Sequence, residues 1–270
     1  MGDKPVQNNQ YCEEFQQQGY IICRNFFSEE EMTTLMEDIR ATEINEDGKH
    51  VLNKGTLNFY SNLFSRSQKI QEFVSQPRLV DLLKQVIGPD FWIRWDQAVA
   101  KGPGAVTFPW HQDNAYSGLK DLHYQLWIAL TKMTSENGGL WLVPGSDKSI
   151  LPHKKIDKHA VYQGTPENPV FVEAKPGDVV LFSSLTLHST TPNVSQDARW
   201  AYVVEYMSLE HFDPTIKPPY FVVARDGKRQ PEFVNFYRGK LNIANQLKYL
   251  PRALGKVAPD WAKNAVLGRN

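Results

Sequence analysis

The sequence has very little cysteine, no excess of either charge and no long apolar run. Its 270 residues include only two cysteines, and 30 basic residues balance 30 acidic ones. Cys12 and Cys23 lie in a chain without a basic and then apolar leader, which predicts free thiols in a reducing, cytoplasmic compartment. Zero formal net charge provides no overall field that would recruit nucleic acid or an anionic membrane surface.

The apolar runs are too short for a membrane protein. LWIAL (Leu126–Leu130) and VVLF (Val179–Phe182) fall far short of the ~20 residues of a membrane-spanning helix. With 41% hydrophobic and 22% charged residues, the composition is that of an ordinary globular protein. We therefore expect a single domain over residues 1–270, with no membrane or nucleic-acid partner; the sequence leaves the oligomeric state open.

Helical patterns dominate residues 11–88. The segment FFSEEEMTTLMEDIRATEI has Ser28 as a candidate N-cap and Glu31 three residues later, the spacing of a capping box. A second helical stretch, SQKIQEFVSQPRLVDLLKQVIG, ends at Gly88 and Pro89.

Short extended runs then follow from Phe91 to Met207, separated by Gly, Pro and Asn. Helical patterns do not alternate with these runs, so an antiparallel sandwich or jelly roll is favoured over a parallel sheet. Residues 208–270 form a C-terminal extension, in which Asp226-Gly227 predicts a hairpin and LNIANQLKYL predicts a helix. The predicted class is mainly β (α+β), with the core over about 91–207.

The segment WHQDNAY (Trp110–Tyr116) contains the first candidate site. In an extended segment His111 and Asp113 point to the same side, with Gln112 turned away. This pair alone also fits a surface turn or a hydrogen-bonded pair. His188, at the end of the apolar run LFSSLTLHS, would need a hydrogen-bond partner or a metal if it were buried.

Two histidines and one carboxylate form the facial triad that holds non-haem Fe(II) for oxygen chemistry. Such an oxygenase also needs a cationic anchor for 2-oxoglutarate, and Arg199 follows His188 at the start of the next extended run. Alone, Arg199 would be taken for a solvated residue at a strand end. Gln97, in phase with Val99 and Lys101, is a candidate pocket residue or a polar residue on a strand edge.

These residues resemble the phytanoyl-CoA dioxygenase (PhyH) family of Fe(II)/2-oxoglutarate oxygenases. The resemblance covers about Phe91 to Met207 and follows the family's order: WHQD (110–113), QLWIAL (125–130), ENGGLWLVPGSDKS (136–149), KPGDVVLFSSLTLHST (175–190) and Arg199. It implies a double-stranded β-helix (a cupin-like jelly roll) with N-terminal helices packed on it. The iron ligands would be His111, Asp113 and His188, and Arg199 would bind 2-oxoglutarate.

The resemblance also assigns Trp127 and Thr190 to the 2-oxoglutarate site, although a core tryptophan and a turn threonine are the plain alternatives. The implied cofactors are Fe(II), 2-oxoglutarate and O₂, with ascorbate as a supporting reductant. Asp113 favours hydroxylation or a related C–H oxidation over chlorination, because halogenating relatives have a small residue there. A charge-balanced chain without a peroxisomal tail signal favours a small biosynthetic metabolite as the substrate over an acyl-CoA. The alternative is a jelly-roll module that binds a small ligand without oxygen chemistry.

Overall fold

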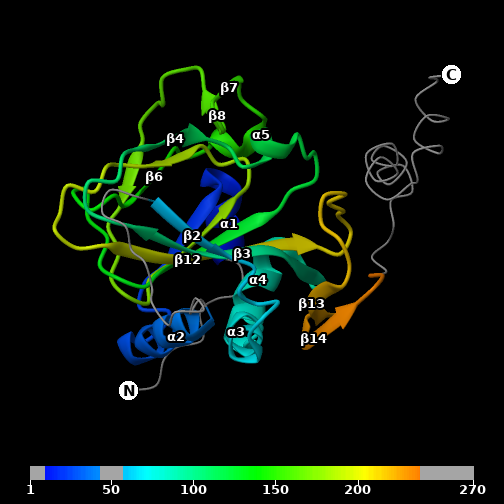
Figure 1. Ribbon diagram of the computed structural model, residues 1–270. Coiled ribbons are helices and arrows are strands. Elements are labelled where there is room, and N and C mark those ends of the chain that lie inside the picture. Colours follow the sequence, from blue (N-terminus) through cyan, green and yellow to red (C-terminus); the bar gives the residue numbers. More distant parts are fainter. Residues whose placement is uncertain (1–9, 43–56, 238–270) are drawn as a thin grey trace, which may run out of the picture.

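The computed structural model describes residues 10–42 and 57–237. Two antiparallel sheets face each other, and helices cover the outer side of the larger one (Figure 1). The large sheet has eight strands: in spatial order β1 (Tyr20–Cys23), β10 (Val179–Ser183), β5 (Tyr124–Ala129), β12 (Arg199–Ser208), β3 (Phe91–Lys101), β13 (Tyr220–Arg225) and β14 (Lys228–Val234), with β2 (Leu57–Ser61) also paired to β3. The predicted jelly-roll core is confirmed.

The small sheet lies above the large one in Figure 1 and carries four short strands. Their order is β4 (Phe108–His111), β11 (His188–Thr190), β6 (Leu140–Leu142) and β9 (Val170–Val172). A separate hairpin, β7 (His153–Ile156) and β8 (His159–Tyr162), packs beside β4. The small sheet is built from the segments that contain the WHQD and LTLHS motifs, so the fold gathers these motifs on one layer.

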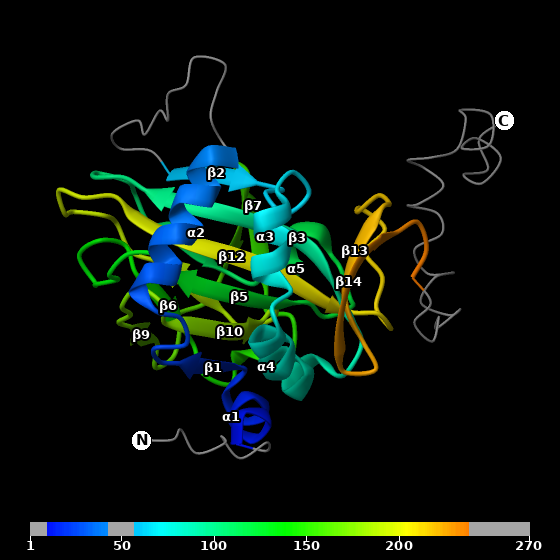
Figure 2. The same cartoon turned by 90° about the horizontal axis from the view of Figure 1, so that it is seen from below.

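The N-terminal helices pack on the outer face of the large sheet, as predicted (Figure 2). These helices are α1 (Gln10–Gln18), α2 (Glu29–Thr42), α3 (Gln68–Val74) and α4 (Pro77–Ile87). The short α5 (Asn114–Ser117) lies beside β8 instead, and a 3₁₀ turn spans Ser146–Lys148. The capping box of α2 is present: Ser28 Oγ accepts a hydrogen bond from the Glu31 N–H (3.2 Å), and Glu31 Oε2 accepts one from the Ser28 N–H (2.8 Å).

Two features of the helical segment differ from the prediction. Its second stretch is two helices, because Pro77 restricts Gln76 to an extended conformation (φ −63°, ψ 149°) and starts a new helix. In addition, β2 interrupts the segment and joins the large sheet through pairing with β3, as β1 does upstream through pairing with β10. Strands of four or five residues are too short to give a clear alternating pattern.

Side-chain alternation gives the large sheet two different faces. On β12 the residues Trp200, Tyr202, Val204 and Tyr206 belong to the core beneath the helices. The alternate residues Ala201 and Val203 belong to a second core between the two sheets, together with Trp127 and Val99. A residue of the second set therefore points toward the small sheet and its histidines.

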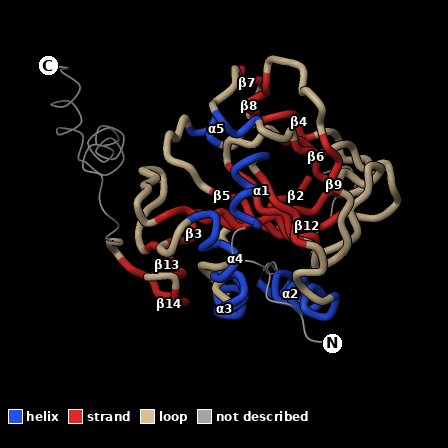
Figure 3. The backbone as a smooth tube through the Cα atoms, turned by 180° about the vertical axis from the view of Figure 1, so that it is seen from behind, coloured by secondary structure: helices blue, strands red, loops and turns tan. Residues whose placement is uncertain are grey.

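The C-terminal hairpin is confirmed within the described residues. β13 and β14 turn at Asp226 and Gly227, which have φ of 50° and 69°, and β14 lies beside α4 at the end of the large sheet (Figure 3). The predicted helix LNIANQLKYL lies outside the described residues. Among the described helices, none is long and apolar enough to cross a membrane.

The KPGD turn joins the N-terminal helices to the sheet, and it gives a test of the fold. Gly177 has φ +90°, and a Cβ on it would lie 2.1 Å from the carbonyl oxygen of Phe27. Gly88 has φ +99° but no atom within 4 Å of such a Cβ. Both alanine variants suffer the strain of positive φ, and only Gly177→Ala adds a backbone clash. We expect Gly177→Ala to lose at least about 2 kcal/mol more unfolding free energy than Gly88→Ala in urea titrations; equal losses would contradict the packing.

Candidate active site

Antiparallel pairing in the small sheet brings the two predicted histidines side by side. His111, the last residue of β4, is the direct register partner of His188, the first residue of β11, and their ring centroids are 4.0 Å apart. Asp113 lies just beyond β4, and one ligand atom from each of the three residues lies within 4.8 Å of the others. In residues 10–42 and 57–237, no other three His, Cys, Asp or Glu side chains converge in this way.

Backbone carbonyls fix which ring nitrogen of each histidine is free. Nδ1 of His111 lies 2.7 Å from the Pro109 carbonyl oxygen, and Nδ1 of His188 lies 2.9 Å from that of Thr186. Since a carbonyl only accepts, each Nδ1 carries the proton and each Nε2 keeps its lone pair. Burial and the nearby His188 hold the pKa of His111 well below its usual value, so this ring is neutral and suited to a metal.

Asp113 completes a set of donors that fits a divalent cation. Its Oδ1 lies 3.6 Å from His111 Nε2 and 3.7 Å from His188 Nε2, beyond hydrogen-bond length. Two ligands that each bind one ion at about 2.1 Å lie roughly 3 to 3.6 Å apart, close to this spacing. Burial raises the pKa of Asp113. A bound cation would offset that cost, and two imidazoles with one carboxylate suit iron.

Arg199 occupies the other end of the same space. It is 2% exposed, donates to the Gly138 carbonyl oxygen from Nη2 (2.7 Å), and places its guanidinium carbon 5.8 Å from the ring centroid of Trp127. Its Nε is buried and has no hydrogen-bond partner among the described residues. Burial lowers the pKa of Arg199 to about 10, which leaves it positively charged at neutral pH. A buried cation with a free donor is suited to an anionic ligand.

Lys101 is a second buried cation that sequence reasoning did not identify. It is the register partner of Arg199 on β3, and its Nζ donates to Thr190 Oγ1 (2.9 Å). Burial and the charge of Arg199 lower its pKa to about 7. No carboxylate of the described residues forms an ion pair with either cation. A Cβ on Gly138 would lie 2.5 Å from Lys101 Cδ, which explains one glycine of the NGG motif.

The structure brings all the predicted site residues together. One cavity between the sheets is lined by each of them: His111, Asp113, His188, Arg199, Trp127, Thr190 and Gln97. Gln97 on β3 and Trp127 on β5 are both register partners of Val203 on the intervening β12. The signal for Lys101 was present in the sequence, because it lies two and four residues from Val99 and Gln97 and therefore shares their face.

Gln112 points away from the triad, as predicted, and ties down the connection that follows β6. Its Nε2 donates to the Ser149 carbonyl oxygen (3.0 Å) and its Oε1 accepts from the Leu151 N–H (2.7 Å). The same Nε2 also donates to the carbonyl oxygen of Leu185, near the start of β11 (2.5 Å). Gln112 therefore links the end of β4 and the segment before β11, which carry the two histidines, to the loop that contains Ser149 and Leu151.

A buried polar network, which the sequence analysis did not predict, continues from Asp113 into the large sheet. Gln125 Nε2 donates to Asp113 Oδ2 (2.6 Å) and lies 3.5 Å from Glu205 Oε1. Arg94 pairs with Glu205 and with Asp213. Since both neighbours of the Gln125 amide are carboxylates, its NH₂ group must face them. Burial raises the pKa of Glu205 to about 7.

Comparisons with known proteins agree with this geometry. Residues 15–201 match the phytanoyl-CoA dioxygenase (PhyH) family. A probable alpha-ketoglutarate-dependent hypophosphite dioxygenase of Stutzerimonas stutzeri is 25% identical, over 73% of this chain and 77% of that protein. The ectoine dioxygenase of Bordetella parapertussis is 24% identical, over 76% of each.

Solved structures show the same fold. The epimerase SnoN, in complex with Fe3+, alpha ketoglutarate and nogalamycin RO, superposes with a TM-score of 0.62 at 17% identity, covering 82% of this chain and 86% of SnoN. The protein is an enzyme, so the alternative of a binding module without oxygen chemistry is set aside. The chain belongs to the phytanoyl-CoA dioxygenase (PhyH) family and is an Fe(II)/2-oxoglutarate-dependent dioxygenase.

Proposed function

We propose that this dioxygenase oxidises a C–H bond of a small-molecule metabolite, by hydroxylation or a related reaction, while 2-oxoglutarate becomes succinate and CO₂. The observation that carries the proposal is one cavity lined by three metal-binding side chains and by the buried cation Arg199, with a second buried cation, Lys101, beside Arg199. An ectoine dioxygenase among the relatives supports a small-molecule substrate. The large sheet takes strands from residues 20–234, which supports a single domain, and we propose that it acts in the cytoplasm.

In this proposal His111, Asp113 and His188 hold Fe(II). Bound Fe(II), together with 2-oxoglutarate, supplies the activation of O₂. The chain itself orients the ligands: the carbonyls of Pro109 and Thr186 hold the two imidazoles, and Gln125 holds the carboxylate. The presence of Asp113, in place of a small residue, supports oxidation over chlorination.

The cationic end of the cavity would bind the distal carboxylate of 2-oxoglutarate. Arg199 has a buried Nε without a partner, and Lys101 lies beside it with Thr190 as its hydrogen-bond acceptor. Two buried cations without a carboxylate among the described residues are costly unless an anion joins them. Trp127 and Gln97 would form the walls between this end and the triad.

Anaerobic titration of Fe(II)-loaded enzyme with 2-oxoglutarate tests the site directly. We expect the weak visible charge-transfer band of the chelate in the wild type, and no band and no succinate formation in His111→Ala. Arg199→Ala should weaken 2-oxoglutarate binding by about 2 kcal/mol, roughly thirtyfold, because a charge-assisted hydrogen-bond pair is lost. Arg24→Ala, which removes a half-exposed arginine outside the cavity, is the matched control. Unchanged affinity in Arg199→Ala would contradict the anchor.

Gln125 should act as a positioning residue for the iron carboxylate. Gln125→Leu keeps the approximate volume and removes the donor to Asp113 Oδ2, so the carboxylate can rotate away from the histidines. We expect Fe(II) affinity, measured by titration without 2-oxoglutarate, to fall about 10- to 100-fold. Gln97→Leu is the control, because Gln97 lines the same cavity but forms no hydrogen bond with Asp113. This variant should bind Fe(II) with wild-type affinity. Equal Fe(II) affinity in both variants would remove this role.

Lys101 should make 2-oxoglutarate binding depend on pH. Its pKa of about 7 leaves it charged at pH 6 and mostly neutral at pH 8, while a bound carboxylate favours the charged form. Affinity for 2-oxoglutarate should therefore fall about tenfold from pH 6 to pH 8 in Fe(II)-saturated enzyme. Lys101→Met should bind more weakly at pH 6 and show a flat profile, since Arg199, the other charged group facing this site, does not titrate there. A wild-type profile without this slope would show that Lys101 does not contact the ligand.

A further inference from the structure

A second, larger cavity opens where the edge of β3 has no neighbouring strand. β2 pairs with Gln97–Lys101, the N–H of Asn62 just after β2 donates to the Asp96 carbonyl oxygen, and β13 pairs with Phe91–Ile93. Among the described residues, 94 and 95 therefore have no strand partner on that side. The cavity at this gap has a volume of about 600 Å³, against about 100 Å³ over the triad. We call it the β3 notch. The smaller cavity is the one proposed to hold 2-oxoglutarate.

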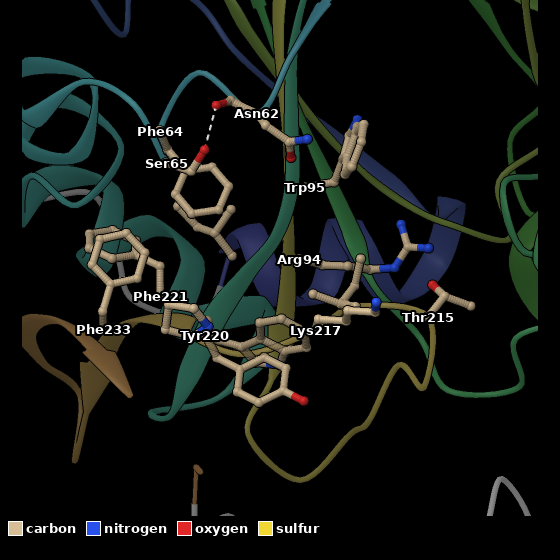
Figure 4. A pocket seen from close by; sticks show the side chains of 14 residues that line it. Asn62, Phe64, Ser65, Arg94, Trp95, Thr215, Lys217, Tyr220, Phe221 and Phe233 are labelled. Carbon is tan, nitrogen blue, oxygen red and sulfur yellow. Dashed lines mark hydrogen bonds between the residues drawn. The ribbon is translucent and has the colours of Figure 1, made fainter. Parts of the chain in front are cut away.

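The walls of the β3 notch are largely aromatic (Figure 4). They include Phe64, Trp92, Trp95, Tyr220, Phe221 and Phe233. Phe64 and Phe233 are stacked, with an interplanar angle of 13°. Aromatic walls of this kind favour a flat apolar ring system, which can stack on them or meet their edges.

The inner end of the notch reaches the network behind the triad. Trp95 lines the notch and is the register partner of Glu205, which in turn is the partner of Gln125, the donor to Asp113. Trp95 and Gln125 are thus two strand spacings, about 10 Å, apart. Arg94 also lines the notch while pairing with Glu205. The two cavities share no lining residue, so a molecule in the notch reaches the triad only by passing Trp95, Glu205 and Gln125 along the inner face of the sheet.

Charge differs between the two ends of the notch. At the inner end Arg94 is held by Glu205 and Asp213, both buried, so that no free cation faces the occupant there. At the rim, Lys217 is exposed and forms no ion pair with the described residues, and Thr215 lies nearby (Figure 4). A complementary ligand is neutral where it faces the triad and carries its anionic group at the rim.

We propose that the β3 notch binds the body of the substrate, a planar, largely aromatic molecule whose anionic group lies at Lys217 and whose reacting carbon extends past Trp95 toward His111, Asp113 and His188. This rests on the proposed function, because it names the substrate class of the same active site. It assigns substrate selection to residues outside the metal and 2-oxoglutarate sites.

The test uses 8-anilinonaphthalene-1-sulfonate, an aromatic anion, with the full chain loaded anaerobically with Fe(II) and 2-oxoglutarate. We expect saturable fluorescence enhancement at one site in the wild type. Phe233→Asp should weaken probe binding at least about tenfold, by placing a carboxylate on an aromatic wall. Lys217→Glu should weaken it severalfold by repelling the sulfonate. Phe236→Asp is the matched control, because Phe236 is 87% exposed but does not line the notch. This variant should bind the probe with wild-type affinity.

Two outcomes would overturn the proposal: no saturable binding to wild type, or equal weakening by Phe233→Asp and Phe236→Asp. Thermal unfolding of each variant checks that Phe233→Asp remains folded, and Lys217→Glu provides an independent result at an exposed position. The charge-transfer band is recorded in the same samples. A normal band without probe binding rejects only the notch, whereas an absent band rejects the proposed function itself.

Discussion

The antiparallel register between β4 and β11 is the constraint on which the site depends. It places His188 directly opposite His111, and a slip of one residue would turn one of the two imidazoles to the other face of the sheet. Both Nδ1 atoms are then fixed by the carbonyl two residues earlier in the chain. The same local geometry at both positions orients both Nε2 atoms toward Asp113, so backbone pairing sets the direction of the metal-binding atoms.

β12 complements this arrangement from the large sheet. Arg199, Ala201, Val203 and Glu205 alternate along its inner face, and Arg199 and Val203 of this set line the cavity. Their outer neighbours, such as Trp200 and Tyr202, pack into the core beneath the helices. One strand therefore anchors the helical layer with one face, while its other face places Arg199 in the site and Glu205 in the polar network behind Asp113.

Much of this could be predicted from the sequence, and the failures have physical causes. The jelly roll, the N-terminal helices, the β13–β14 hairpin and the convergence of His111, Asp113 and His188 follow from local patterns and motif spacing. Lys101, Gln125 and Glu205 were missed because each is an ordinary residue of its own strand. Only strand register places Lys101 beside Arg199 and Gln125 beside Asp113. The β3 notch was also unpredictable, because it arises where β2 and β13, distant in sequence, pair with separate parts of β3.

The distribution of charge explains why so many ionisable groups are buried in a domain of this size. Arg199 is buried in the cavity with Lys101 beside it, and Asp113 lies at the other end; among the described residues they form no ion pair with one another, and each loses hydration. A divalent cation beside Asp113 and a dianion reaching Arg199 would together leave no net charge. Lys101 then decides whether the loaded site is neutral or singly positive. Since burial brings its pKa to about 7, its charge can respond to the ligand at physiological pH. The folded chain therefore bears a desolvation cost that its ligands remove, and this cost favours their binding as a pair.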